Sequence, residues 1–106
     1  LKLKFMISNV ILKNGKYYVQ DEKQKEISSK FDIAIGELMG FSSDLVVFLK
    51  NSKFYIYDEN LKEISSKFDT NLGQFKNVAG KTITFLKNGK MYVYDEKLKE
   101  ISSRFI

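Results

Sequence analysis

The chain has 106 residues and a formal net charge of +5, from 18 Lys and Arg against 13 Asp and Glu. It contains no Cys and no His, which excludes disulfides, thiolate sites and the commonest zinc ligand and general base. Basic and acidic residues alternate along the chain instead of clustering, which is typical of a solubilising surface. We therefore expect no nucleic-acid partner, because nucleic-acid grooves are marked by clustered basic residues.

No apolar run approaches the roughly 18 residues of a membrane-spanning helix, so we expect no membrane span. The N-terminal LKLKFMISNV lacks both a long apolar region and a small-residue cleavage site. The sequence therefore predicts no signal peptide, and it indicates no compartment.

One phrase of 22 residues occurs three times at a spacing of 37. It reads ILKNGKYYVQDEKQKEISSKFD from Ile11, FLKNSKFYIYDENLKEISSKFD from Phe48 and FLKNGKMYVYDEKLKEISSRFI from Phe85. The second and third copies are identical at 16 of the 22 positions. A period of this length is the signature of a repeat architecture. We divide the single repeat domain, 1–106, into repeat 1 (1–32), repeat 2 (33–69) and repeat 3 (70–106).

The predicted elements are short strands separated by turns, four to a repeat. In repeat 1, residues 1–10 occupy the position of the first strand, before the hairpin Asn14-Gly15. In repeat 2, strands are expected around 38–41, 45–49, 54–57 and 63–68. In repeat 3, they are expected around 75–78, 82–87, 90–95 and 99–105. Asn-Gly favours a type I′ hairpin because both residues tolerate positive φ. The sequence indicates no helix of appreciable length.

The strands differ in how their two faces are expected to be covered. The middle strand of repeat 2 places Phe54 and Ile56 on one face and Tyr55 and Tyr57 on the other, so both faces need cover. The last strand alternates: Ile64, Ser66 and Phe68 line one face, and Glu63, Ser65 and Lys67 line the other. This alternation predicts that the Glu-Ser-Lys face is wet.

The repeat resembles a β-propeller blade of the WD type in the segment FSSDLVVFLKNSKFYIYDENLKEISSKF from Phe41. Tyr57-Asp58 stands where such blades carry an aromatic-Asp pair. The N-G-K-x-Y-x-Y-D-x-x-x-K-E-I run from Asn88 is also similar to short bacterial WG-type repeats. The chain departs from both families, because it has no Trp and no Gly-His pair. The resemblance implies a scaffold and not a catalyst.

The expected fold class is all-β, with three tandem four-stranded antiparallel meander repeats of about 37 residues that are propeller-blade-like. Natural propellers hold about four to eight blades, so three blades do not close a ring. A homodimer would complete a six-bladed ring, or the chain would belong to a longer array. The alternative is a β-trefoil, which closes three repeats of four strands into one barrel.

The sequence offers few groups for catalysis. Asp21-Glu22, Asp58-Glu59 and Asp95-Glu96 are paired carboxylates, but neighbouring strand residues point to opposite faces, so we expect each Asp to cap local N–H groups. Ser28-Ser29, Ser65-Ser66 and Ser102-Ser103 have no His to activate them. We expect no enzymatic activity, no metal site and no cofactor.

Binding residues are expected in two groups. The segments 33–44 and 70–81 differ between repeats, and repeat proteins often place their binding surface in such variable segments. These segments hold the candidates Met39, Phe41, Gln74, Phe75, Lys76 and Asn77. The equivalent tyrosines Tyr18, Tyr55 and Tyr92 are candidates for partner contact, although two-sided strands favour a place in the core between repeats.

These features predict a non-enzymatic repeat scaffold for protein binding or self-assembly, which as a dimer would complete a six-bladed ring. The alternative is a lectin-like carbohydrate-binding β domain with one shallow glycan site in each repeat. The expected partners are accordingly a protein, a second copy of the chain, or a glycan.

Overall fold

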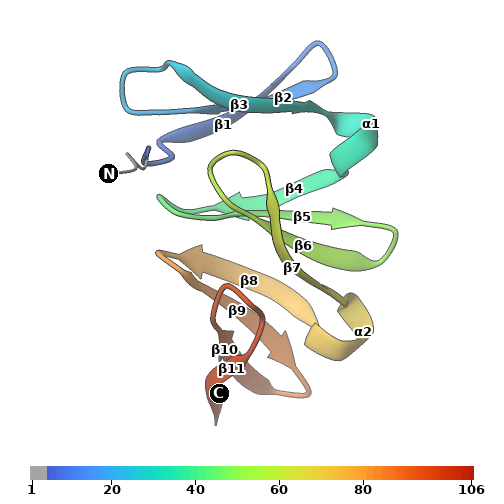
Figure 1. The fold of residues 1–106 in the computed structure, drawn as a ribbon. Helices are drawn as coiled ribbons and strands as arrows, with labels where there is room; N and C mark the ends of the chain where they lie inside the picture. The colour runs from blue at the N-terminus through green and yellow to red at the C-terminus, as the bar shows by residue number, and fades with distance from the viewer. Residues whose placement is uncertain (1–4) are drawn as a thin grey trace.

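The computed structural model describes residues 5–106, which form three antiparallel β-sheets in series (Figure 1). Sheet 1 contains β1 (Asn9–Lys13), β2 (Lys16–Gln20) and β3 (Glu26–Phe31). Sheet 2 contains β4 (Glu37–Phe41), β5 (Val46–Lys50), β6 (Lys53–Tyr57) and β7 (Glu63–Phe68). Sheet 3 contains β8 (Gln74–Ala79), β9 (Thr82–Lys87), β10 (Lys90–Tyr94) and β11 (Glu100–Phe105). Each sheet is a meander, because its strands pair in chain order.

The expected all-β class with repeated blade-like units is confirmed, with two qualifications. The three sheets stay separate and none closes into a barrel among the described residues, so the β-trefoil alternative is wrong. Sheet 1 has three strands where four were expected. Residues 5–8 form no strand, and the rest of the expected strand, residues 1–4, lies outside the described part of the chain.

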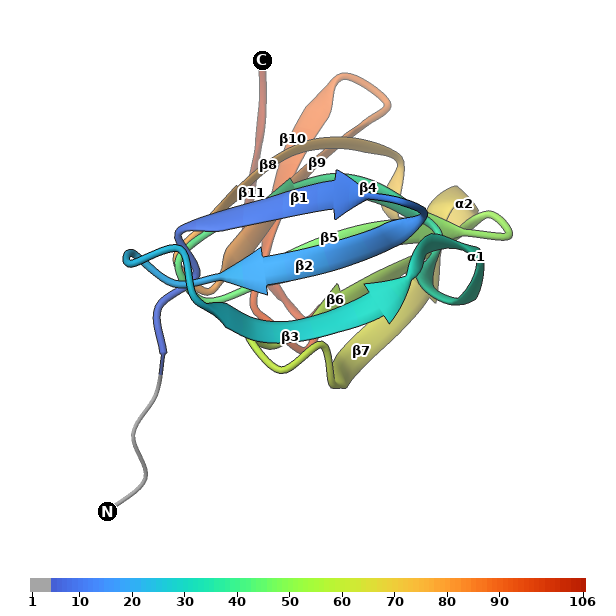
Figure 2. The same ribbon diagram turned by 90° about the horizontal axis from the view of Figure 1, so that it is seen from above.

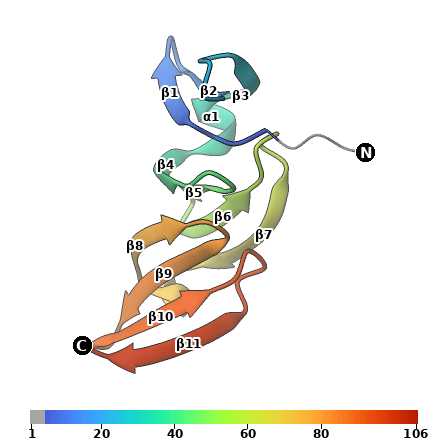
Figure 3. The same cartoon turned by 90° about the vertical axis from the view of Figure 1, so that its left-hand side faces the viewer.

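The sheets stack face to face, with sheet 2 between the other two (Figures 2 and 3). Two apolar clusters fill the spaces between them, one between sheets 1 and 2 and one between sheets 2 and 3. The same edge-to-face aromatic pair recurs in both clusters. Tyr17 meets Phe48 with ring centroids 5.0 Å apart, and Phe54 meets Phe85 at the same 5.0 Å. The core therefore lies between the repeats and not within any one of them.

The hairpin turns have the expected left-handed backbone. Asn14 and Gly15 have φ of 53° and 75°, and Asn88 and Gly89 have 54° and 74°. Ser52, which stands where the other two copies have Gly, has φ of 64°. The type I′ hairpin expected from Asn-Gly therefore also forms in the second copy.

A second turn, after the middle strand of each repeat, is built on an aspartate. One carboxylate oxygen of Asp21 accepts the backbone N–H groups of Lys23 at 2.9 Å and Lys25 at 3.0 Å. Asp58 and Asp95 accept the equivalent N–H groups within 3.0 Å. The expectation that each Asp caps its own turn is confirmed.

Two helical turns, α1 (Asp32–Ile35) and α2 (Asp69–Leu72), connect the sheets and were not expected from the sequence. Each ends at a glycine with positive φ, 101° at Gly36 and 93° at Gly73. A Cβ on Gly36 would lie 2.6 Å from the carbonyl oxygen of Leu49, so only glycine fits there. No helix among residues 5–106 is long and apolar enough to cross a membrane.

Candidate functional site

The described residues contain no cluster of candidate metal ligands. Among residues 5–106, no three His, Cys, Asp or Glu side chains gather where they could hold a metal ion. In each Asp-Glu pair, the Asp carboxylate accepts backbone N–H groups of its own turn. The two carboxylates of a pair therefore have different surroundings. The features that recur are instead the contacts from one sheet to the next. We call the side of a sheet that faces the following sheet its forward face, and the opposite side its rear face.

Hydrogen bonds from the last strand of one sheet to the Asp-centred turn of the next recur at both contacts. The hydroxyl of Ser28 donates to the carbonyl oxygen of Glu59 at 2.7 Å, and the hydroxyl of Ser65 donates to that of Glu96 at 2.6 Å. The ammonium group of Lys67 also donates to the carbonyl oxygen of Leu98, at 3.0 Å. Glu63 and Lys67 are exposed, as expected of a wet face. The expectation is wrong for Ser65, which is half-buried and bonds to the next sheet.

The rear faces of sheets 2 and 3 are apolar and fully covered. Phe48 and Phe85 are 0% exposed, and the equivalent turn residues Leu61 and Leu98 are 1% and 0% exposed. The remaining buried members of these faces are Val46, Ile83, Tyr57 and Tyr94. Burial of side chains this large is the main stabilising contribution of a β stack. Sheets 2 and 3 thus each depend on the preceding sheet to cover their rear face.

The rear face of sheet 1 has a different composition at the same positions. Asn9, Gln20 and Gln24 stand where both other repeats have apolar or aromatic residues, and Ile11 stands where they have Phe. No sheet covers this face among the described residues, so Ile11 and Tyr18 remain only half-buried. A shallow hollow of about 350 Å³ lies here. Its lining is Ile11, Lys13, Asn14, Tyr18, Gln20, Gln24 and Glu26.

The forward face of sheet 3 is also open and also more polar than its internal counterpart. Thr82 and Thr84 stand where sheet 2 buries Leu45 and Val47. Leu86, Met91 and Val93 keep this face partly apolar and are half-buried. Ser102 and Arg104, the equivalents of Ser65 and Lys67, are exposed. The two ends of the stack therefore present one forward and one rear face without a neighbouring sheet in the described chain.

The two variable segments come together along one edge of the stack, where β4 and β8 lie next to each other (Figure 3). Gly40 permits this approach, because a Cβ there would lie 3.0 Å from the Phe75 ring. Met39 and Phe75 pack on the cluster between sheets 2 and 3, and Phe41 packs on the cluster between sheets 1 and 2.

The other three candidates of these segments, Gln74, Lys76 and Asn77, are exposed on β8. The six predicted residues therefore divide into a core half and a surface half. Only the surface half offers side chains to a partner.

The three equivalent tyrosines also separate. Tyr55 and Tyr92 pack against the inter-sheet clusters, whereas Tyr18 lines the hollow on the open rear face of sheet 1. Each has a lysine ammonium near its ring, and the same lysine lies over a phenylalanine of the last strand. For Lys53 these distances are 5.7 Å to the Tyr55 ring centroid and 5.1 Å to the Phe68 ring centroid. This cation–π arrangement was missed, although the recurring Lys and Phe positions carry its signal.

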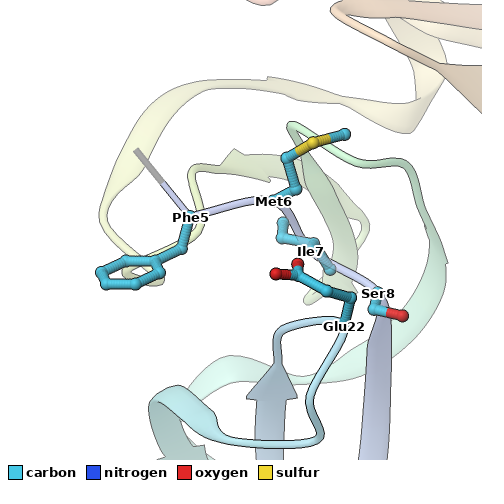
Figure 4. Close-up of a pocket in the computed structure, with 5 residues that line it drawn as sticks. All are labelled: Phe5, Met6, Ile7, Ser8 and Glu22. Atoms are coloured by element: carbon cyan, nitrogen blue, oxygen red, sulfur yellow. The ribbon is translucent and has the colours of Figure 1, made fainter. Parts of the chain in front are cut away.

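A further hollow, of about 510 Å³, lies beside the N-terminal segment and is lined by Phe5, Met6, Ile7, Ser8 and Glu22. Figure 4 shows Phe5 and Met6 pointing away from each other, with the Glu22 carboxylate near Ile7. Phe5 and Met6 are 51% and 59% exposed, whereas Ile7 is buried. Ile7 also donates its backbone N–H to the carbonyl oxygen of Ser43 at 2.9 Å, which ties the segment to sheet 2.

One side chain of the inter-sheet core has a strongly shifted pKa. Burial, with a smaller contribution from the charge of Glu63, raises the pKa of Tyr57 from 10.0 to about 12. Burial raises the pKa of the equivalent Tyr94 in the same direction. Both phenols therefore stay neutral at physiological pH, which suits their place in the inter-sheet core.

The fold and its contacts define an all-β repeat protein made of stacked blade-like sheets. No family model and no curated protein sequence matches the chain. One similar solved structure is described as KlHsv2 with loop 6CD replaced by a Gly-Ser linker, with a TM-score of 0.54 and 15% sequence identity. The likeness covers 82% of this chain and 30% of that one. At this identity it concerns the fold alone.

Proposed function

We propose that the protein is a non-enzymatic repeat scaffold that works by assembling with protein partners, and first of all with a second copy of itself. One observation carries this proposal. The same inter-sheet contact is made twice within the chain, and each end of the stack presents one half of it.

Assembly of two copies would place six sheets in one ring, within the usual range of about four to eight blades. Small chains bury a limited fraction of their surface, so covering the two open faces would also add stability. The absence of His and Cys and the capping role of the Asp side chains support a structural rather than a catalytic use of the repeats.

Light scattering coupled to size-exclusion chromatography tests the self-assembly directly. The chain has a mass of 12.3 kDa, and we expect twice that mass over a range of concentrations. A mass of 12.3 kDa at every concentration would remove self-assembly from the proposal and leave only binding to other proteins.

A lectin-like function is the second candidate, and the hollow around Tyr18 favours it. An aromatic ring beside amide and carboxylate groups is an arrangement suited to a sugar. The equivalent Tyr55 and Tyr92 pack between sheets, which limits such a site to sheet 1 instead of one in each repeat. A glycan array comparing the native chain with Tyr18→Ala tests this candidate, since signals that do not depend on Tyr18 would count against it.

A further inference from the structure

We infer that the forward face of sheet 3 docks, head to tail, on the rear face of sheet 1 of a second copy, through the contact that already joins the sheets within one chain. This inference rests on the proposed self-assembly and names its two surfaces. The occupant follows from the repeat architecture. Within this chain, the surface that packs on the forward face of a sheet is the rear face of the next sheet, and a second copy offers the same kind of rear face on its sheet 1.

The hydrogen-bonding half of the contact is preserved at both ends. Ser102 keeps the hydroxyl that Ser28 and Ser65 use, and Arg104 keeps a cationic donor at the position of Lys67. The acceptors in this contact are main-chain carbonyl oxygens, so they do not depend on side-chain identity. The carbonyl oxygen of Glu22 is the equivalent acceptor on sheet 1.

The turn that presents this acceptor is also intact in sheet 1. Asp21 accepts the same two backbone N–H groups as Asp58 and Asp95, at 2.9 Å and 3.0 Å. The Glu22 carbonyl is therefore carried by the same turn as the carbonyls of Glu59 and Glu96. Docking would place the Ser102 hydroxyl against it.

The apolar half of the contact has changed on both sides together. Within the chain the centre of each contact is an aromatic pair, Tyr17 with Phe48 and Phe54 with Phe85. The next pair in this series is Met91 with Ile11 of the second copy, and both of these residues are aliphatic and half-buried. At the contact between copies, Met91 and Ile11 would therefore form a smaller apolar contact in the place that an aromatic pair occupies within the chain.

The polar substitutions around this centre fit a contact between separate chains. Thr82 and Thr84 lie on one face, and Asn9, Gln20 and Gln24 lie on the other. Interfaces that form between separately folded units are more polar than a permanent core, because each face must also be stable in water before it docks. Hydroxyl and amide groups satisfy both conditions, since they bond to water when free and to each other when docked.

The test uses one variant of each face. Ile11→Glu places a charge on the rear face of sheet 1, and Met91→Glu places one on the forward face of sheet 3. Ile33→Glu, at a residue that is 87% exposed on α1, is the matched control. Far-ultraviolet circular dichroism and urea unfolding show whether each variant keeps its fold. Gln24→Arg and Ser102→Arg, at exposed residues of the same two faces, form a second pair if a glutamate variant unfolds.

Each face variant alone is expected to have the mass of a single chain, because every head-to-tail contact in it has one damaged side. An equimolar mixture of the two is expected to regain the doubled mass, because one undamaged contact forms between unlike chains. The mixed pair has one contact where the native pair has two. Its dissociation constant should therefore be at least about tenfold higher than that of the native pair.

Other results would overturn the inference. If only one of the two face variants loses the pair, the copies join through two identical faces, which contradicts head-to-tail docking and leaves self-assembly standing. If both variants keep the doubled mass, the contact lies elsewhere on the chain. A native chain that stays at the mass of one copy defeats the inference together with proposed self-assembly.

Discussion

The rear faces of sheet 1 and sheet 2 occupy equivalent places in the repeat but differ in chemistry. Sheet 2 buries Phe48 and Leu61 against sheet 1, whereas sheet 1 presents Ile11 and Gln24 at the same positions to an open hollow. The backbone is nearly unchanged, since the left-handed φ is 55° at Leu61 and 62° at Gln24. The repeat phrase thus specifies the same strand and turn geometry in both sheets. The covered face carries apolar side chains on it, and the open face carries more polar ones.

The same comparison explains why the repeats are not independent units. A single meander with two apolar faces would expose both of them, and stacking is what covers them. Polar outer faces are typical of repeats whose outer side meets water, and the rear face of sheet 1 carries Asn9 and Gln20. What distinguishes these ends from simple caps is that the donor Ser102 and the Asp21 turn of the inter-sheet contact are retained.

The largest contrast is expected at the centre of the covered face. Phe48→Ala should lower the free energy of unfolding by about 3–5 kcal/mol, because it removes a fully buried ring and leaves a cavity. Ile11→Ala at the equivalent, half-buried position should cost about 1 kcal/mol. Urea unfolding of both variants in the Met91→Glu background, in which we expect single chains, measures the contrast. Equal losses there would contradict an open rear face on sheet 1.

The turn residues give a contrast in sign. Leu61→Gly relieves a left-handed backbone but loses a buried side chain, so we expect a net loss of about 2 kcal/mol. Gln24→Gly relieves the same backbone without losing burial, so it should leave stability unchanged or raise it by up to about 1 kcal/mol. Thermal unfolding of the two variants in the Met91→Glu background, in which we expect single chains, separates them. Destabilisation by Gln24→Gly in that background would contradict the exposed state of that turn.

The serines give a smaller contrast. Ser65→Ala removes the donor to the Glu96 carbonyl and should cost about 1 kcal/mol. Ser102→Ala should change the stability of the single chain by less than about 0.5 kcal/mol, because this serine is exposed. The second value is to be measured in the Met91→Glu background, in which we expect single chains, so that lost docking does not contribute.

The smallest effect at neutral pH is expected for Tyr57→Phe, which keeps the ring. Its influence should appear in alkali, because the unfolded phenol ionises near 10 and the folded one near 12. Unfolded chains release this proton first, so the phenol lowers stability as the pH rises through this interval. Tyr57→Phe should flatten that decline. Tyrosinate absorbance that lacks a late-titrating group in the native chain would contradict the assignment.

Much of this architecture could be predicted from the sequence because its signals are local. Asn88-Gly89 specifies a hairpin through its own backbone preferences, and Asp95 specifies a turn through bonds to residues two and four positions on. The helical turns α1 and α2 were missed because four residues are too short for a helical period. Ser65 was wrongly expected to be wet because it meets its acceptor in the next repeat, 31 residues along the chain.

The candidate site could be predicted only in part. The variable segments do meet at one edge, but Met39, Phe41 and Phe75 serve the core there, which apolar residue type alone does not reveal. The polar character of the rear face of sheet 1 could have been predicted from the sequence. Aligning the three copies and asking where an apolar position becomes polar identifies Gln20 and Gln24 directly.

Cysteine cross-linking tests the docking contact most directly, because the native chain contains no Cys. Ser65→Cys with Glu96→Cys in one chain calibrates the reaction within the known inter-sheet contact. Ser102→Cys in one copy and Glu22→Cys in another then report the equivalent contact between copies. We predict a covalent pair of chains under the conditions that form the internal cross-link. An internal cross-link that forms while the Ser102→Cys and Glu22→Cys chains remain separate would contradict head-to-tail assembly.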